Sequence, residues 1–453
     1  MTKNLFDSFN PVSAKQWKQK IQFDLKGADY NDMLIWKTNE DIDVKPFYHA
    51  DDFEKVPNTS STKATQWKIC QSIFVADVEK SNLNAIRSIE GGAEQINFII
   101  PSDAISINNL IQHINVEAVT LQFELLFQPE AYTKQIQNLV PKAKIKADSI
   151  GQLAKTGNWF KGLKEDLKLS ESLIKRTNEL HINGSLYQNA GATMVQQLAY
   201  TLAHTNEYLN ILDESKSDLS ALRATLHLAV GTNYFFEIAK LRALRMLWKT
   251  LASEYHIQSD CIIEVTPTKR NKTVYDYNTN MLRTTTECMS AVLGGANSIC
   301  NLPYDYIYNK SNEFADRIAR NQLLILKNES YFDKVNNPSD GSYYIESLTH
   351  QLAENALGLF KNIESSGGFL KQLKLGTIQR KIKESALREQ KQFDNGEIIL
   401  SGTNKHPNEM DKMKTKLELY PFVKIKPRKT LIEPIIENRL SEQIEKKRLK
   451  NEN

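Results

Sequence analysis

The sequence has few cysteines, no long apolar run and little net charge, and each shortage excludes a class of protein. Four cysteines are spread over 453 residues and none forms a CxxC pair, which excludes a disulfide framework and a zinc site built on such pairs. No apolar stretch reaches the roughly 20 residues of a membrane span, and the N-terminus contains no apolar signal core. The net charge of +4 is small for this length and gives no indication of nucleic-acid binding. We therefore expect a soluble cytoplasmic protein with free thiols.

Several motifs that mark common functional sites are also missing. No GxGxxG follows the first expected strand, and the nearest P-loop candidate, residues 157–162, is followed by Leu163 where lysine is required. There is no nucleophile elbow, HExxH or paired-carboxylate motif. His181 lies in ELHING, which is similar to the DxHxxG that ligates cobalamin, but a helical pattern follows it instead of a separate flavodoxin-like domain. We interpret His181 as a barrel-strand histidine.

The pattern that is present is an alternation of short apolar runs with helical segments. The hydrophobic content of 41% is enough for a large core. Alternating strands and helices predict a parallel sheet, and about eight strands within more than 300 residues favour a (β/α)8 barrel. The expected strands are residues 69–75, 96–100, 119–127, 143–147, 180–186, 261–265 and 298–302, and helices are expected at 81–90, 129–140 and 194–212.

The chain is expected to have three parts. Residues 1–62 form an N-terminal arm with a helix near residues 13–25 and aromatic side chains that the arm cannot bury by itself. Residues 63–400 form the barrel. Residues 401–453 form a polar C-terminal tail, whose basic end we interpret as a solvated helix.

Two helical segments contain charged residues and glycines at informative positions. The segment 235–251 is amphipathic, and Glu237 can pair with Lys240 three residues later. We interpret it as a helix of the barrel wall. The segment 281–293 ends at Gly294 and Gly295, a pair suited to a helix C-cap because glycine tolerates a positive φ.

Six ordered segments together resemble the methylmalonyl-CoA mutase family, and more closely its small (β) subunit. They are residues 17–38 (WKQKIQFDLKGADYNDMLIWKT), 189–203 (NAGATMVQQLAYTLA), 235–248 (FFEIAKLRALRMLW), 277–299 (YNTNMLRTTTECMSAVLGGANSI), 314–321 (FADRIARN) and 338–349 (PSDGSYYIESLT). The residues of these motifs to which we assign a structural role are Glu237, Arg242, Arg283, Gly294, Gly295, Arg317 and Arg320.

The resemblance implies a TIM barrel whose N-terminal arm wraps a partner subunit. It also implies participation in the radical interconversion of methylmalonyl-CoA and succinyl-CoA, with adenosylcobalamin as the radical source. In catalytic members the substrate threads the barrel axis, and a C-terminal cobalamin-binding domain covers the end of the barrel.

Four departures from the family pattern affect catalysis. The chain ends soon after the point where catalytic members begin the linker to the cobalamin domain. Leu186 stands where catalytic members have a histidine that donates to the thioester carbonyl, and loss of such a donor costs ~10²–10³ in rate. Ser72 stands where the family has a tyrosine near the radical, and the family's HTNA is replaced by CNLP at residues 300–303. We expect the barrel interior to be ordinary core.

These observations leave three hypotheses. The first is a non-catalytic subunit that pairs as a heterodimer with a catalytic (α) subunit, binds no cofactor or metal itself, and leaves adenosylcobalamin to its partner. The second is an active acyl-CoA mutase barrel that uses a separate cobalamin-binding protein; it should have kept the donor and the tyrosine that Leu186 and Ser72 replace. The third is a barrel enzyme with a cobalamin-free activity, which a polar axis with perturbed ionisable groups would favour.

Overall fold

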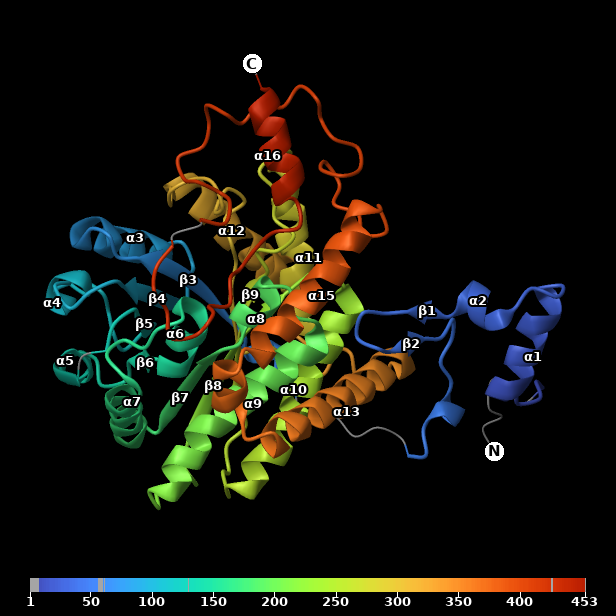
Figure 1. Cartoon of the computed structure of the whole chain (residues 1–453), viewed down its shortest axis with the longest axis horizontal. Coiled ribbons are helices and arrows are strands. Elements are labelled where there is room, and N and C mark those ends of the chain that lie inside the picture. The colour runs from blue at the N-terminus through green and yellow to red at the C-terminus, as the bar shows by residue number, and fades with distance from the viewer. Residues whose placement is uncertain (1–7, 56–59, 61, 129, 425–426, 453) are drawn as a thin grey trace.

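The centre of the molecule is a nearly closed barrel of eight parallel strands surrounded by helices (Figure 1). The computed structural model describes residues 8–55, 60, 62–128, 130–424 and 427–452. The barrel strands are β3 (Lys68–Phe74), β4 (Gln95–Ile100), β5 (Thr120–Leu125), β6 (Lys144–Lys146), β7 (Glu179–Asn183), β8 (Arg223–Val230), β9 (Ile262–Pro267) and β10 (Ser298–Cys300). The predicted (β/α)8 barrel is therefore confirmed.

The strands follow the order β6-β5-β4-β3-β10-β9-β8-β7, and every neighbouring pair is parallel. Pairing of β3 with β10 joins the first barrel strand to the last. Within the described residues, no backbone ladder joins β6 to β7, so the ring has one seam.

Helices connect successive strands and are fixed by local capping. Asp77 accepts a hydrogen bond from the first turn of α3, and Thr193 and Gln196 form a capping box at the start of α9. Asn178 ends α7 in the left-handed conformation, at φ 53°. The helices of the barrel are α3 (Val78–Glu90), α4 (Ile107–Leu110), α5 (Glu130–Leu139), α6 (Ser149–Thr156), α7 (Leu163–Thr177), α8 (Ser185–Asn189), α9 (Met194–Glu214), α10 (Tyr234–Glu254), α11 (Thr279–Leu293), α12 (Glu313–Leu324), the π-helical turn η3 (Ile325–Glu329), α13 (Tyr343–Ser365), α14 (Phe369–Lys374) and α15 (Thr377–Asp394).

The sequence pattern located every barrel strand except β8. Its residues, RATLHLAV, mix alanine and histidine with leucine, and alanine is depleted in strands. The strand expected at residues 180–186 ends earlier, at Asn183, so that Leu186 lies in the short helix α8. That prediction was wrong at its C-terminal end.

The apolar core lies between the outer faces of the strands and the helices. Successive side chains of a strand point to opposite faces, and the outward residues of β4 and β5, such as Phe98 and Phe123, are fully buried. One apolar cluster packs β3–β6 against α3 and α5, and a larger one packs the other strands against α9, α10 and α13. Trp67 and Trp248 are buried in the larger cluster.

The N-terminal arm projects away from the barrel, as its blue ribbon in Figure 1 shows. It consists of α1 (Ala14–Asp24), α2 (Tyr30–Leu34), the two-stranded ribbon β1 (Trp36–Lys37) and β2 (Asp43–Val44), and η1 (Ala50–Asp52), and it is followed by η2 (Ala64–Gln66). Against the described remainder of the chain, α1 buries none of its residues. Large apolar side chains of the arm are exposed to solvent: Phe9, Val12, Trp17, Phe23, Met33 and Trp36.

The turn between β1 and β2 fastens the arm to the barrel. The carboxylate of Glu40 accepts hydrogen bonds from the backbone N–H groups of Met194 (2.9 Å) and Val195 (2.8 Å), in the first turn of α9. A negative group at a helix N-terminus is favourable because the free N–H groups point towards it. Asn39 accepts from Arg388 of α15 through its backbone oxygen at 3.1 Å, so this turn contacts two barrel helices.

The C-terminal segment packs back onto the barrel. Backbone N–H groups of Leu431, Asn438 and Leu440 donate to the carbonyl oxygens of Gly157, Asn189 and Arg270. These three acceptors lie in the connections that leave the C-terminal ends of β6, β7 and β9. The segment therefore crosses that end of the barrel.

The terminal helix α16 (Glu442–Asn451) was expected to be solvated, and this expectation was wrong for one face. Glu442 and Glu445 are buried, and the carboxylate of Glu445 lies 2.7 Å from the guanidinium of Arg439 and accepts from the N–H of Val274 at 2.8 Å. The strongly charged sequence of this segment therefore gave no sign that one face of the helix is packed.

Candidate functional site

The inner face of the barrel is polar, which contradicts the expectation of ordinary core. Gln122 of β5 donates through its side-chain amide to a carboxylate oxygen of Glu264 in β9. The Nζ atom of Lys146 in β6 lies 2.6 Å from the other oxygen of the same carboxylate. Three strands separate β5 from β9 on either side of the ring, so the contact between Gln122 and Glu264 crosses the barrel axis.

The charges in the axis hold each other ionised. Burial alone would raise the pKa of Glu264, but Lys146 and Lys144 more than offset this effect and hold that pKa well below its usual range. Burial would lower the pKa of Lys146, yet the neighbouring Glu264 carboxylate keeps it above its ordinary value. The result is a buried ion pair that persists over the whole neutral pH range.

Two histidines line the same space in neutral form. The Nε2 atom of His227 in β8 lies 2.7 Å from the hydroxyl of Thr266, and burial lowers the pKa of His227 to about 4. The Nε2 atom of His181 in β7 lies 3.4 Å from a carboxylate oxygen of Glu179, and burial lowers its pKa as well. His181 is 8% exposed and lies within β7, as expected for a barrel-strand histidine.

The two replaced catalytic positions lie in different surroundings. Ser72, in β3, is half-buried on the inner face, and its hydroxyl accepts a hydrogen bond from the side chain of Asn97 at 3.2 Å. Leu186, in α8, is 4% exposed and belongs to the larger apolar cluster. A leucine side chain has no hydrogen-bond donor, so this position contributes packing alone.

Glu237 and Arg242 of α10 form buried polar contacts within the barrel wall. Glu237 pairs with Lys240, as the spacing predicted, and both side chains are fully buried. One carboxylate oxygen of Glu237 accepts from the Gly231 N–H at 2.7 Å and from the Gln188 side chain at 3.1 Å, which ties α8 to the end of β8. Arg242 lies 2.6 Å from Glu346 and so joins α10 to α13.

The other three arginines to which we assigned a structural role also lie outside the axis. Arg283 donates to the Ser401 carbonyl at 2.7 Å, and Arg320 donates to the Gly91 carbonyl at 3.0 Å. Arg317 is exposed, with its guanidinium 5.6 Å from the ring centre of Phe314. These contacts connect helices and loops of the wall.

The glycine pair ends α11 as the sequence predicted. Gly294 is the C-cap and Gly295 follows with a φ of +86°, a value that side chains with a Cβ rarely adopt. A Cβ on Gly295 would also come within 2.5 Å of the Thr62 side chain. The pair is therefore required by the turn and by close packing.

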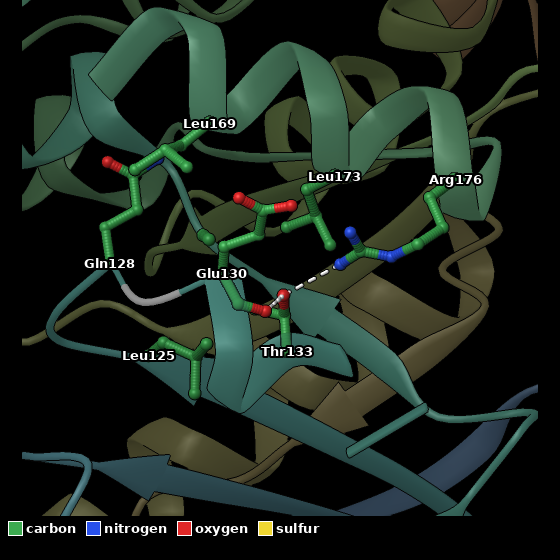
Figure 2. A pocket seen from close by; sticks show the side chains of 8 residues that line it. Leu125, Gln128, Glu130, Thr133, Leu169, Leu173 and Arg176 are labelled. Carbon is green, nitrogen blue, oxygen red and sulfur yellow. Dashed lines mark hydrogen bonds between the residues drawn. The ribbon is translucent and has the colours of Figure 1, made fainter. Parts of the chain in front are cut away.

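Two surface hollows lie outside the axis. Figure 2 shows the first, between α5 and α7, where Arg176 reaches across to donate to Thr133 at 2.7 Å. Its volume of about 10 Å³ is enough for one water molecule. The second, about 420 Å³, is an open groove between the arm and α13, lined by residues that include Phe47, Tyr48 and Tyr343.

Clusters of metal-ligating side chains and helices able to cross a membrane are both absent from the described residues. The described residues contain no group of three or more His, Cys, Asp or Glu side chains arranged to hold a metal ion. Among the described helices, none combines the length and apolar character that crossing a membrane requires.

The polar axis was not predicted from the sequence. The strands of a buried parallel sheet are usually apolar along almost their whole length. In this chain three of them, LQFEL, KIK and IIEVTP, contain the polar residues Gln122, Lys146 and Glu264, and these residues were the available signal. Polar residues at alternate positions of such strands point to the barrel interior.

Comparison with known proteins gives consistent matches along the chain. The family described as methylmalonyl-CoA mutase matches residues 100–447. The methylmalonyl-CoA mutase small subunit of Porphyromonas gingivalis is 34% identical over 440 residues, which cover 89% of this chain and 71% of that protein. The small subunit of Streptomyces virginiae is 26% identical over 89% of this chain and 72% of its own length. The methylmalonyl-CoA mutase of Rhizobium meliloti is 27% identical over 87% of this chain, which spans 64% of its length.

Proposed function

The chain belongs to the methylmalonyl-CoA mutase family, and from that premise we propose that it is a non-catalytic small subunit that pairs with a homologous catalytic subunit. Its role is to stabilise and position that subunit, which interconverts methylmalonyl-CoA and succinyl-CoA. Adenosylcobalamin is bound by the catalytic subunit. This chain supplies the barrel wall and the arm that hold the pair together.

The single observation that carries the proposal is the contact across the barrel axis. A substrate that threads a barrel needs an open axis, but Gln122 and Glu264 meet there from opposite strands and Lys146 joins them. Opening this passage would separate a buried ion pair, and breaking such a pair costs about 3–5 kcal/mol. Leu186 adds to the argument because it has replaced a hydrogen-bond donor with an apolar side chain.

The arm supports the partnership. Trp17, Phe23 and Met33 are 49%, 79% and 63% exposed, and exposed apolar side chains grouped on one projecting element mark an interaction surface. The relatives named as small and large subunits support a pair of unlike chains. An obligate pair buries about 2,000–5,000 Å² of surface.

One observation favours a second candidate, a barrel enzyme with its own cobalamin-free activity. The axis is polar and contains groups with shifted pKa values, including Glu264 and His227. Each of these groups already has a partner within the barrel, however: Glu264 pairs with Gln122 and Lys146, and His227 contacts the Thr266 hydroxyl. Such pairing also shifts pKa values in purely structural networks. We therefore rank this candidate below the small subunit.

Co-purification and activity together test the proposal. The chain is expressed alone and with the catalytic subunit from the same source, and mutase turnover is measured with added adenosylcobalamin. We expect a stable complex in which this chain raises the stability or activity of the catalytic subunit and shows no turnover alone. Turnover by this chain alone would establish an active mutase instead. A stable monomer that does not co-purify would contradict the partnership.

Variants of the arm locate the interface. Trp17→Ala combined with Phe23→Ala removes apolar surface from α1, which contributes nothing to the described core, so the barrel should keep its melting temperature. We expect co-purification with the catalytic subunit to fall at least tenfold. Leu375→Ala is the matched control, because that leucine is 67% exposed on the α14–α15 turn. Equal loss from both variants would contradict a role for the arm.

A further inference from the structure

Two cysteines face each other where the barrel ring closes. Cys70 of β3 and Cys300 of β10 are direct Cα partners in the parallel pair that joins the first and last barrel strands. The two thiols are close enough to influence each other's ionisation, and the Gln95 side-chain amide donates to the Cys70 sulfur at 3.5 Å. Neighbouring strands lie about 4.8 Å apart, within the roughly 4.4–6.8 Å that separates Cα atoms across a disulfide.

We propose that Cys70 and Cys300 are a redox modification site, at which a peroxide converts the two free thiols into a reversible disulfide. The bond would link β3 covalently to β10 and lock the closure of the barrel. This site lies on wall strands and does not depend on the function proposed above.

The surroundings assign the order of the two steps. Cys300 is half-buried, whereas Cys70 is 7% exposed. The hydrogen bond with Cys300 and burial together raise the pKa of Cys70 well above its ordinary value, so Cys70 supplies little thiolate for a first reaction. A molecule as small as hydrogen peroxide therefore reacts first at the more accessible Cys300, and Cys70, its direct partner on the adjacent strand, completes the bond.

The chemistry balances with peroxide as the oxidant. The Cys300 thiolate attacks one peroxide oxygen, the O–O bond breaks, and Cys300 becomes a sulfenic acid while the departing oxygen takes up a proton as water. The Cys70 sulfur then attacks the Cys300 sulfur, the S–S bond forms, and the hydroxide that leaves takes the Cys70 proton as a second water. Two thiols are oxidised and one peroxide is reduced, and a dithiol reverses the change.

The other two cysteines provide an internal control. Cys261 and Cys288 are buried in the larger apolar cluster, on separate elements, and burial raises the pKa of both thiols. They should resist peroxide under conditions that oxidise the pair. All four cysteines are free in the structure, so the starting thiol count is defined.

The test is thiol counting and peptide mapping on the full chain. The folded protein is treated with hydrogen peroxide, denatured, alkylated with a maleimide and digested. We expect two of the four thiols to be lost, with one cross-linked peptide that contains Cys70 and Cys300 and lacks two hydrogen atoms, and full recovery with dithiothreitol. The melting temperature of the oxidised protein should rise, because the bond closes a loop of more than 200 residues.

Variants separate this outcome from general oxidation. Cys261→Ser should leave the cross-link unchanged, whereas Cys300→Ser should leave Cys70 fully alkylated. Oxidation of Cys300 to a sulfinic or sulfonic acid while Cys70 stays a free thiol would overturn the proposal. So would a peroxide dose that oxidises Cys261 or Cys288 before the pair. If a variant does not fold, peptide mapping of the wild-type chain still shows which cysteines are oxidised and whether Cys70 and Cys300 are cross-linked.

Discussion

The arm and the barrel axis invert the usual distribution of side chains in opposite ways. The arm exposes apolar side chains, with Phe23 79% accessible, whereas the axis buries charged ones, with Glu264 5% accessible. Both arrangements are unfavourable unless something compensates for them. The axis contains its own compensation, because lysines and an amide surround the carboxylate. The exposed apolar side chains of the arm have only marginal contacts within the described residues, such as that of Lys20 with the Phe23 ring, and the proposed partner subunit would cover them.

This difference separates what can be tested in the isolated chain from what can be tested only in the proposed complex. The axis should respond to mutation in the isolated chain, as a change in folding stability. The exposed face of the arm should respond only in the complex.

Glu264→Ala should destabilise the isolated chain by about 3–5 kcal/mol, because it leaves Lys146 buried without its carboxylate. Chemical denaturation followed by circular dichroism measures the loss. Glu313→Ala is the control, since Glu313 pairs with Arg87 on the surface and such pairs contribute about 0–1 kcal/mol. Combining Glu264→Leu with Lys146→Met should recover most of the loss. A wild-type stability for Glu264→Ala would show that the axis charges do not support the fold.

His227 should make folding stability fall as the solution is acidified. The pKa of its folded form is about 4, below its ordinary value of 6.5, so the unfolded chain binds the proton more readily. The contribution is fully present above pH 6.5 and is lost as the pH falls towards 4, and it amounts to about 3 kcal/mol. Melting curves between these pH values measure it.

The matched variant for this pH dependence is His227→Gln, which cannot titrate. Its stability should change less than that of the wild type over the same pH interval. Parallel pH profiles for the two proteins would contradict a buried neutral histidine.

Glu40→Ala should detach the arm from the barrel at a cost of about 1–2 kcal/mol, because two N–H groups of α9 lose their acceptor. Limited proteolysis should release the arm faster, with a small fall in melting temperature. Asp43→Ala changes an exposed carboxylate in the same ribbon and serves as the control. Equal cleavage rates for the two variants would mean that Glu40 does not fasten the arm.

Leu186→His should give no gain of mutase activity, measured with adenosylcobalamin and methylmalonyl-CoA. The variant restores a hydrogen-bond donor in α8, but the contact between Gln122 and Glu264 still crosses the axis. Turnover above background would mean that the axis opens for a substrate. It would favour the active-mutase alternative.

The barrel architecture could be predicted from the sequence because each strand shows its own pattern of apolar residues, which can be recognised without knowing what the strand contacts. The strand β8 was not predicted because its alanine and histidine residues weaken that apolar signal. The axis network could not be assembled in the same way, since Gln122 and Glu264 are 142 residues apart and meet only once the ring has formed. The packing of α16 could not be predicted for the same reason, because Glu445 accepts its hydrogen bond from Val274, which lies 171 residues earlier in the chain.

Within the part of the chain that the structure describes, the seam between β6 and β7 leaves two strand edges without a backbone ladder. Such edges invite pairing with another chain and aggregation. The sequence of β6 reduces the risk of such pairing. The strand, Lys-Ile-Lys, is only three residues long, and both lysines point towards the Glu264 carboxylate. A short edge strand with inward charges is a poor template for a foreign strand. Lys144 and Lys146 would thus protect the folded chain against self-association as well as neutralise its interior, and replacing them by apolar residues would expose a site for aggregation.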